Sequence, residues 1–150
     1  MKIWLDKDEN GDIIHKTLEN LLDHSEKRYN SDDKLYEIHL KKFDQENRLI
    51  EKLITDENGN EKENHLYEYH EQKRIWKFIL NGSFVKTEKT VYDSNKNPTF
   101  YIRKDSNGKC LEWYGFEYDT LGNKTKYFWG HEEGKQNGFK TFEQTYYNND

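Results

Sequence analysis

The dipeptide Asn-Gly recurs along this chain and constrains its fold more than any other feature. It occurs five times, and its asparagines are Asn10, Asn58, Asn81, Asn107 and Asn137. Asn-Gly between apolar or β-branched runs indicates a β-hairpin, because a two-residue type I′ turn needs positive φ at both central residues, which Asn tolerates and Gly adopts freely. The sequence therefore predicts an array of β-hairpins with type I′ turns.

A second kind of turn alternates with the first. It joins an aromatic residue and Asp to a short polar segment, and it occurs at Phe43-Asp44, Tyr92-Asp93 and Tyr118-Asp119, with a weaker copy at Tyr69-His70. Together the two turns repeat with a period of about 26 residues, the length of one pair of hairpin strands. We therefore predict an all-β antiparallel hairpin meander of about 10 to 12 short strands in an open or rolled sheet. We expect it to form a single domain over residues 1–150.

The segments between these turns are rich in Val, Ile, Thr and aromatic residues, as strands are. Examples of the predicted strands are residues 35–43, 48–55, 75–80, 84–92, 99–104, 111–118, 125–129 and 139–147. Residues 14–28 leave two alternatives open. Apolar residues from Ile14 to Leu22 recur at helical spacing, which predicts one short amphipathic helix. The segment from His24 to Arg28 instead resembles the segment from His70 to Arg74, which predicts a further repeat turn.

The composition is unusual for a globular protein. Hydrophobic residues are 32% and charged residues 35% of the chain, whereas globular domains have about 45% hydrophobic residues or more. Aromatic residues reach 15%, and each ring can bury on the order of 150 to 250 Å². We therefore predict a thin sheet held together by rings, with lysine stems lying over them.

The charge balance is acidic, with a formal net charge of −5 and both signs interspersed. A nucleic-acid-binding protein would show a basic patch or stripe, so no direct nucleic-acid binding is expected. An acidic surface suits a basic partner, and a modest negative charge also serves solubility alone.

Two further features bear on location. Cys110 is the only cysteine, so no intrachain disulfide forms, whereas small secreted β domains usually depend on disulfides. The apolar run after Met1 ends at Asp6 and is too short for a signal peptide, and no later run reaches membrane-spanning length. We expect a cytoplasmic protein without a membrane partner, unless a leader was removed.

The paired turns carry a resemblance to a known family. The segment from Phe116 to Thr125 reads FEYDTLGNKT and the segment from Val91 to Asn97 reads VYDSNKN. This pattern resembles the YD repeats of Rhs-type proteins, and such units could cover residues 29–147. Large members of that family form shells that enclose a toxin, and this chain is too short to do so. By analogy, the resemblance implies a small intracellular protein of the immunity or antitoxin kind.

No motif for catalysis or metal binding emerges. The six histidines show neither metalloprotease spacing nor the Cys/His spacing of a structural zinc site, and we expect them at the surface or in turns. Cys110 has no neighbouring base, so we expect a strand thiol packed as a small hydrophobic side chain. We therefore predict that the protein is not an enzyme and has no catalytic residues, no metal and no cofactor.

Aromatic residues cluster in the second half of the chain. About half of these rings would hold the sheet together, and the others would form an aromatic surface for binding a protein, where Trp and Tyr supply anchors. Acidic side chains near the rings complete the predicted partner-binding residues: Trp76, Trp113, Tyr127, Trp129, Asp119, Glu132 and Glu133.

From this surface we predict a non-catalytic protein that inhibits or neutralises another protein by occluding its surface, of immunity-protein or anti-defence type. The expected partner is a toxin or a defence effector. The alternative is a carbohydrate-binding β-repeat module, because flat rings also stack on sugars.

Overall fold

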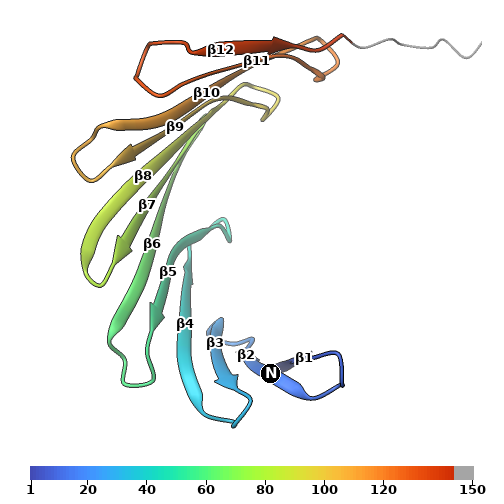
Figure 1. Ribbon diagram of the computed structural model, residues 1–150, viewed down its shortest axis with the longest axis vertical. Helices are drawn as coiled ribbons and strands as arrows, with labels where there is room; N and C mark the ends of the chain where they lie inside the picture. The colour runs from blue at the N-terminus through green and yellow to red at the C-terminus, as the bar shows by residue number, and fades with distance from the viewer. Residues whose placement is uncertain (144–150) are drawn as a thin grey trace, which may run out of the picture. The chain divides into compact units, whose positions relative to one another are not determined.

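The computed structural model describes residues 1–143, which form twelve β-strands and no helix. Consecutive strands are neighbours throughout, so the sheet is an open antiparallel meander in the order β1 to β12 (Figure 1). The strands are β1 (Lys2–Lys7), β2 (Ile13–Asn20), β3 (Ser25–Asn30), β4 (Leu35–Phe43), β5 (Leu49–Thr55), β6 (Glu61–His70), β7 (Lys73–Leu80), β8 (Ser83–Tyr92), β9 (Pro98–Asp105), β10 (Cys110–Tyr118), β11 (Lys124–Gly130) and β12 (Gly138–Thr141).

The predicted all-β meander is confirmed, and the helical alternative for residues 14–28 is wrong. These residues form most of β2, a turn, and most of β3. Strand β2 pairs with β1 on one side and with β3 on the other, whereas an isolated helix of this length would be marginal. Leu21 and Leu22, which contributed to the helical spacing, lie in the turn, and Leu22 is 94% exposed.

The predicted strand bounds agree with the structure to within two residues, except at the last strand. Strand β12 ends at Thr141, so Phe142 and Glu143 are not part of it. The remainder of the strand predicted over residues 139–147 lies outside the described residues.

The type I′ prediction is correct at one of the Asn-Gly turns and wrong at the others. Asn81 and Gly82 both have positive φ, of 48° and 73°. In the Asp-x-Asn-Gly turns only the glycine does, because these are three-residue loops held by the Asp side chain. The Asp56 carboxylate accepts the N–H groups of Asn58 at 2.9 Å and Asn60 at 2.8 Å. Neither residue of Asn137-Gly138 has positive φ.

The three-residue loop recurs seven times, at residues 8–12, 30–34, 44–48, 56–60, 93–97, 105–109 and 119–123. In each loop the fourth residue has positive φ, even where it is Asp33, Asn47 or Lys96. Each loop is followed by a register shift in the strand pair that it joins. A type I turn followed by a left-handed residue and a bulge has this geometry. The bulge decides which residues of neighbouring strands lie opposite one another.

The described chain forms two compact units. The first comprises Met1–Tyr67 and Lys77–Val85, and the second comprises Glu68–Trp76 and the described residues from Lys86 onward. The prediction of a single domain stays a prediction.

Burial is sparse in both units. Among the described residues the buried hydrophobic side chains are Ile54 in the first unit and Ile102, Cys110 and Trp113 in the second. The last three pack together with Phe100 and Phe128. The predicted packing of Cys110 is therefore confirmed, and its burial raises the pKa of the thiol.

Candidate protein-binding surface

Five aromatic side chains line one face of β9, β10 and β11 in the second unit. Cross-strand pairing sets them opposite one another: Tyr101 faces Tyr114, Tyr114 faces Trp129, and Phe116 faces Tyr127. Because residues two apart on a strand share a face, the five rings lie on the same side of the sheet. We call Tyr101, Tyr114, Phe116, Tyr127 and Trp129 the aromatic ladder.

The rings of the ladder contact one another. Tyr101 stacks on Tyr114 with ring centroids 5.6 Å apart, and Tyr114 stacks on Tyr127 at the same 5.6 Å. Tyr127 also stacks on Trp129 at 5.4 Å and contacts Phe116 at 5.5 Å. Aromatic pairs at such distances are worth about 0.5 to 1.5 kcal/mol each beyond the area they bury. The ladder is therefore a pre-ordered surface whose side chains lose little freedom on binding.

Carboxylates flank the ladder on the same face. Glu88 and Glu112 both lie opposite Arg103 in the neighbouring strands, and the Arg103 guanidinium lies 3.0 Å from the Glu112 carboxylate. The Tyr114 hydroxyl donates to Glu112 Oε2 at 2.8 Å. Burial, together with the charge of Glu88 and a hydrogen bond to it, raises the pKa of Tyr101. The hydrogen bond to Glu112 raises the pKa of Tyr114, so both phenols are hydrogen-bond donors at neutral pH.

The structure separates the two tryptophans at the centre of the predicted site. Trp113 lies opposite Gly130, and its neighbour Tyr114 lies opposite Trp129, so Trp113 and Trp129 point to opposite faces. Trp113 belongs to the buried cluster and exposes 7% of its surface. Its indole N–H donates to the Glu132 carbonyl at 2.7 Å. Trp113 therefore packs within the C-terminal strands, whereas Trp129 and Tyr127 belong to the ladder.

The predicted acidic residues have local partners. The Asp119 carboxylate accepts the N–H groups of Leu121 and Asn123 within its own turn. Glu133 pairs with Lys104 at 2.6 Å, and the exposed Glu132 pairs with Lys135 at 3.2 Å. The partner-binding role predicted for these residues stays a prediction.

Trp76, the remaining predicted residue, lies on β7 and is half-buried. The Lys86 ammonium lies 4.8 Å from the centre of its ring. This is a cation–π contact between a charged lysine and an indole.

Sequence reasoning missed Tyr101, Tyr114 and Phe116 as partners of Tyr127 and Trp129. It placed Trp113 and Trp129 in one site, although the pairing between strands decides which face each ring occupies. The signal that could have found the ladder is the turn at residues 105–109, because its bulge determines that Tyr101 lies opposite Tyr114.

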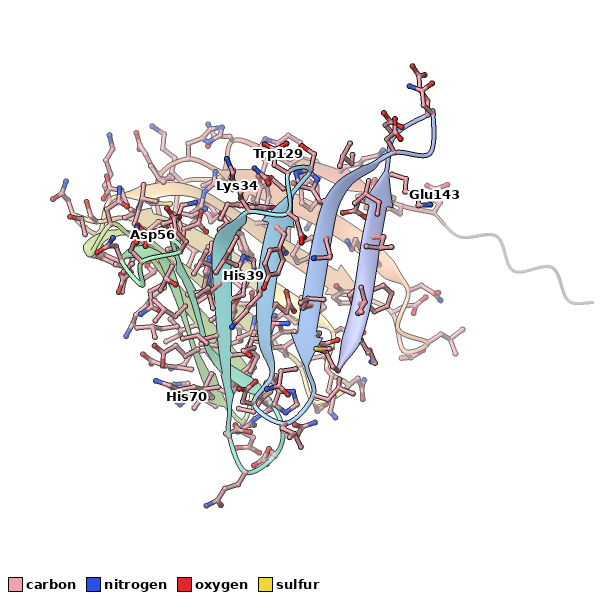
Figure 2. The ribbon with its side chains drawn as sticks, turned by 90° about the horizontal axis from the view of Figure 1, so that it is seen from below. Lys34, His39, Asp56, His70, Trp129 and Glu143 are labelled. Carbon is pink, nitrogen blue, oxygen red and sulfur yellow. The ribbon has the colours of Figure 1, made fainter. Side chains whose placement is uncertain are left out.

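A second polar group lies in the first unit, around His39 on β4 (Figure 2). The expectation of surface or turn histidines is wrong here, since His39 is 2% exposed. Its Nε2 lies 3.0 Å from Glu37 Oε2, and its Nδ1 has no hydrogen-bond partner. Burial lowers the pKa of His39 despite the neighbouring Glu37. The imidazole is covered, so it is poorly placed to meet a substrate.

The carboxylates beside His39 are held by lysines. Glu26 pairs with Lys41, and Glu37 pairs with Lys62 at 2.9 Å. Burial alone would raise the pKa of both carboxyl groups, but the lysines, together with His39 and, at Glu26, Arg28, outweigh it and both pKa values lie below the ordinary range. These ion pairs cross-link β3, β4 and β6, which indicates a structural role.

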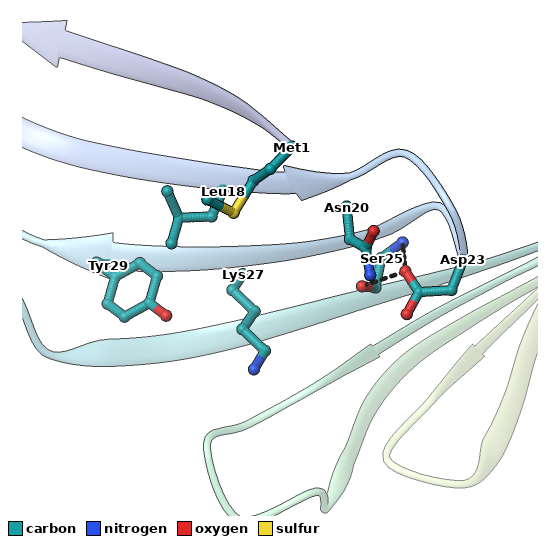
Figure 3. A pocket seen from close by; sticks show the side chains of 7 residues that line it. All are labelled: Met1, Leu18, Asn20, Asp23, Ser25, Lys27 and Tyr29. Atoms are coloured by element: carbon teal, nitrogen blue, oxygen red, sulfur yellow. Dashed lines mark hydrogen bonds between the residues drawn. The ribbon is translucent and has the colours of Figure 1, made fainter.

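One hollow of about 430 Å³ lies beside Met1 on β2, β3 and the turn between them in the first unit (Figure 3). Its polar side chains include Asp23 and Ser25, which bind each other through the Ser25 hydroxyl at 2.7 Å. This hydrogen bond lowers the pKa of Asp23. Since Asp23 is already engaged, the hollow offers less to a ligand than the ladder does.

The fold and the ladder define the class of this protein: an open antiparallel β-hairpin meander with an aromatic surface on its C-terminal strands. Neither a scan against protein-family models nor a search of curated proteins finds a match to this chain. The resemblance to YD repeats therefore stays a prediction. Within residues 1–143 there is no helix long and apolar enough to cross a membrane.

Proposed function

We propose that this chain is a non-catalytic binding protein that inhibits or neutralises another protein by covering part of its surface. The observation that carries the proposal is the aromatic ladder, which combines stacked rings with the carboxylates of Glu88 and Glu112. Tyrosine and tryptophan anchors dominate protein interfaces, and the formal net charge of −5 favours a partner with a basic surface. A toxin or defence effector of a bacterium or phage is the partner class that the YD-like turns suggest.

The stacking favours a protein partner over a sugar. Side chains stand roughly perpendicular to a sheet, and here the ring planes of Tyr101, Tyr114 and Tyr127 stack against each other at 27° and 17°. Their faces are therefore largely occupied by neighbouring rings, and ring edges and hydroxyls remain for a partner. Stacking on a sugar needs a free ring face, so the carbohydrate-binding alternative has less support.

The proposal is tested by affinity capture with the tagged chain from its native cell, followed by titration of the captured protein in pure form. We expect Tyr114→Ala combined with Trp129→Ala to weaken binding by about thirtyfold or more, because anchor residues contribute about 2 kcal/mol or more. The captured protein should also lose its own activity when it is bound by the unmodified chain.

Phe139→Ala provides the matched control, because Phe139 is an aromatic residue of β12 that is 60% exposed and lies opposite Phe128, away from the ladder. This variant should bind like the unmodified chain, and thermal unfolding should show that all variants are folded. Equal binding by the ladder variant would refute the proposed surface. A change of tryptophan fluorescence on titration with a soluble polysaccharide, in the absence of protein capture, would favour the carbohydrate-binding alternative.

A further inference from the structure

Strand β1 forms an edge of the sheet with exposed apolar side chains between charged ones. It pairs with β2 on one side, and no strand among the described residues pairs with its other side. All six of its residues are exposed, including Ile3 at 57%, Trp4 at 58% and Leu5 at 46%. An exposed edge strand with apolar side chains is a template for pairing with another strand, unless charges, proline or bulges protect it. The register shift of β1 lies between Asp6 and Lys7, so the segment from Lys2 to Asp6 is regular.

The sequence of this regular segment is symmetric about Trp4. Ile3 and Leu5 flank the tryptophan, and Lys2 and Asp6 carry opposite charges at equal distances from it. An antiparallel partner of the same sequence, related by a two-fold axis at Trp4, would set Lys2 against Asp6 and Ile3 against Leu5. Cross-strand pairs of opposite charge and apolar pairs both stabilise a sheet.

Neighbouring registers lose this match. A two-fold axis at Ile3 would set the charged Lys2 against Trp4. An axis at Leu5 would set Trp4 against Asp6. The Trp4 register also lets the N–H and C=O groups on the open side of β1 form hydrogen bonds with the second copy. A two-fold axis between antiparallel strands can pass through a hydrogen-bonded or a non-hydrogen-bonded residue pair.

We propose that two copies of this chain associate through their β1 strands, paired antiparallel about a two-fold axis at Trp4. The partner is a second copy because the charges of β1 complement the same strand in reverse. The contact is isologous and closes at a dimer, whereas pairing of β1 with another edge would continue into a filament. The opposite edge, β12, has only four residues, Gly138–Thr141.

The test is a charge swap measured by analytical ultracentrifugation over a range of concentrations. The unmodified chain should show a monomer–dimer equilibrium. Asp6→Lys places two lysines against each other at both ends of the interface, and Lys2→Asp does the same with carboxylates. Each single variant should weaken self-association by about tenfold or more. Glu57→Lys, in the exposed turn between β5 and β6, makes the same charge change away from β1 and should leave the dimer unchanged.

An equal mixture of the Lys2→Asp and Asp6→Lys variants should restore association, because every charged pair across the axis is then complementary. The double variant on one chain should also dimerise, and circular dichroism should show that each variant retains its β-structure. The proposal is overturned if the unmodified chain remains monomeric at about 1 mM, if Asp6→Lys dimerises as strongly as the unmodified chain, or if neither the mixture nor the double variant recovers the dimer.

Discussion

Three glycines in the C-terminal strands lie beneath aromatic rings of the neighbouring strand. Gly115 faces Phe128, Gly130 faces Trp113, and Gly138 faces Trp129. A Cβ atom at Gly115 would lie 1.7 Å from Cε2 of Phe128, far inside contact distance. A ring that covers a glycine replaces the packing that the glycine itself cannot supply. At the residue scale, the missing Cβ atoms of these glycines leave the space that the three rings occupy.

We expect Gly115→Ala to lower the free energy of unfolding by about 1 to 3 kcal/mol, because the added methyl group displaces the Phe128 ring. Denaturant unfolding followed by tryptophan fluorescence measures the change. The control is a double-mutant cycle with Phe128→Leu, whose smaller side chain relieves the clash. Additive effects of the two substitutions would contradict the proposed contact, since residues in contact are coupled.

The three-residue loop is the feature that recurs at the scale of the element. Its fourth position has a φ of 81° at Gly108 and 66° at Lys96. A residue with a side chain costs about 1 to 2 kcal/mol in the left-handed region, whereas glycine adopts it freely. The loop at residues 93–97 therefore carries strain that the loop at residues 105–109 does not.

Exchanging the residue type between these two loops tests this difference. We expect Lys96→Gly to raise the free energy of unfolding by up to about 1 kcal/mol and Gly108→Lys to lower it by about 1 to 2 kcal/mol. Thermal unfolding of the two variants and the unmodified chain gives the comparison. Changes of the same sign in the unfolding free energy of both variants would show that strain at the left-handed residue does not distinguish the two loops.

At the scale of the whole molecule, stability depends on many local groups, because few side chains are buried. Turn carboxylates are prominent among them. Hydrogen bonds from backbone N–H groups, and from the side chains of Arg48, Asn60 and Asn97, lower the pKa values of Asp44, Asp56 and Asp93. A carboxyl group whose pKa is lowered on folding stabilises the fold at pH values above its pKa in the unfolded chain, here 3.8. This stabilisation is lost as the pH falls through the lower pKa of the folded state.

We therefore expect the unfolding free energy to fall as the pH drops below about 4. Replacing Asp44, Asp56 and Asp93 together by Asn should reduce this acid dependence, because an amide oxygen accepts the same bonds without titrating. Asn30 already does so in its own loop, where Oδ1 accepts two backbone N–H groups. Urea unfolding between pH 7 and pH 3 measures the slope, and an unchanged slope in the triple variant would contradict the assignment to these turns.

The sequence by itself determined the hairpin meander, most strand bounds and the packing of Cys110, because turn residues and strand composition act locally. It did not determine the turn type. Asn-Gly alone predicts a two-residue turn, whereas the Asp three positions before the glycine stabilises a three-residue loop. The tertiary structure decided which aromatic residues meet. A one-residue bulge reverses the face of every side chain beyond it, so the separation of Trp113 from Trp129 and the joining of Tyr101 to Tyr114 depend on pairing between strands.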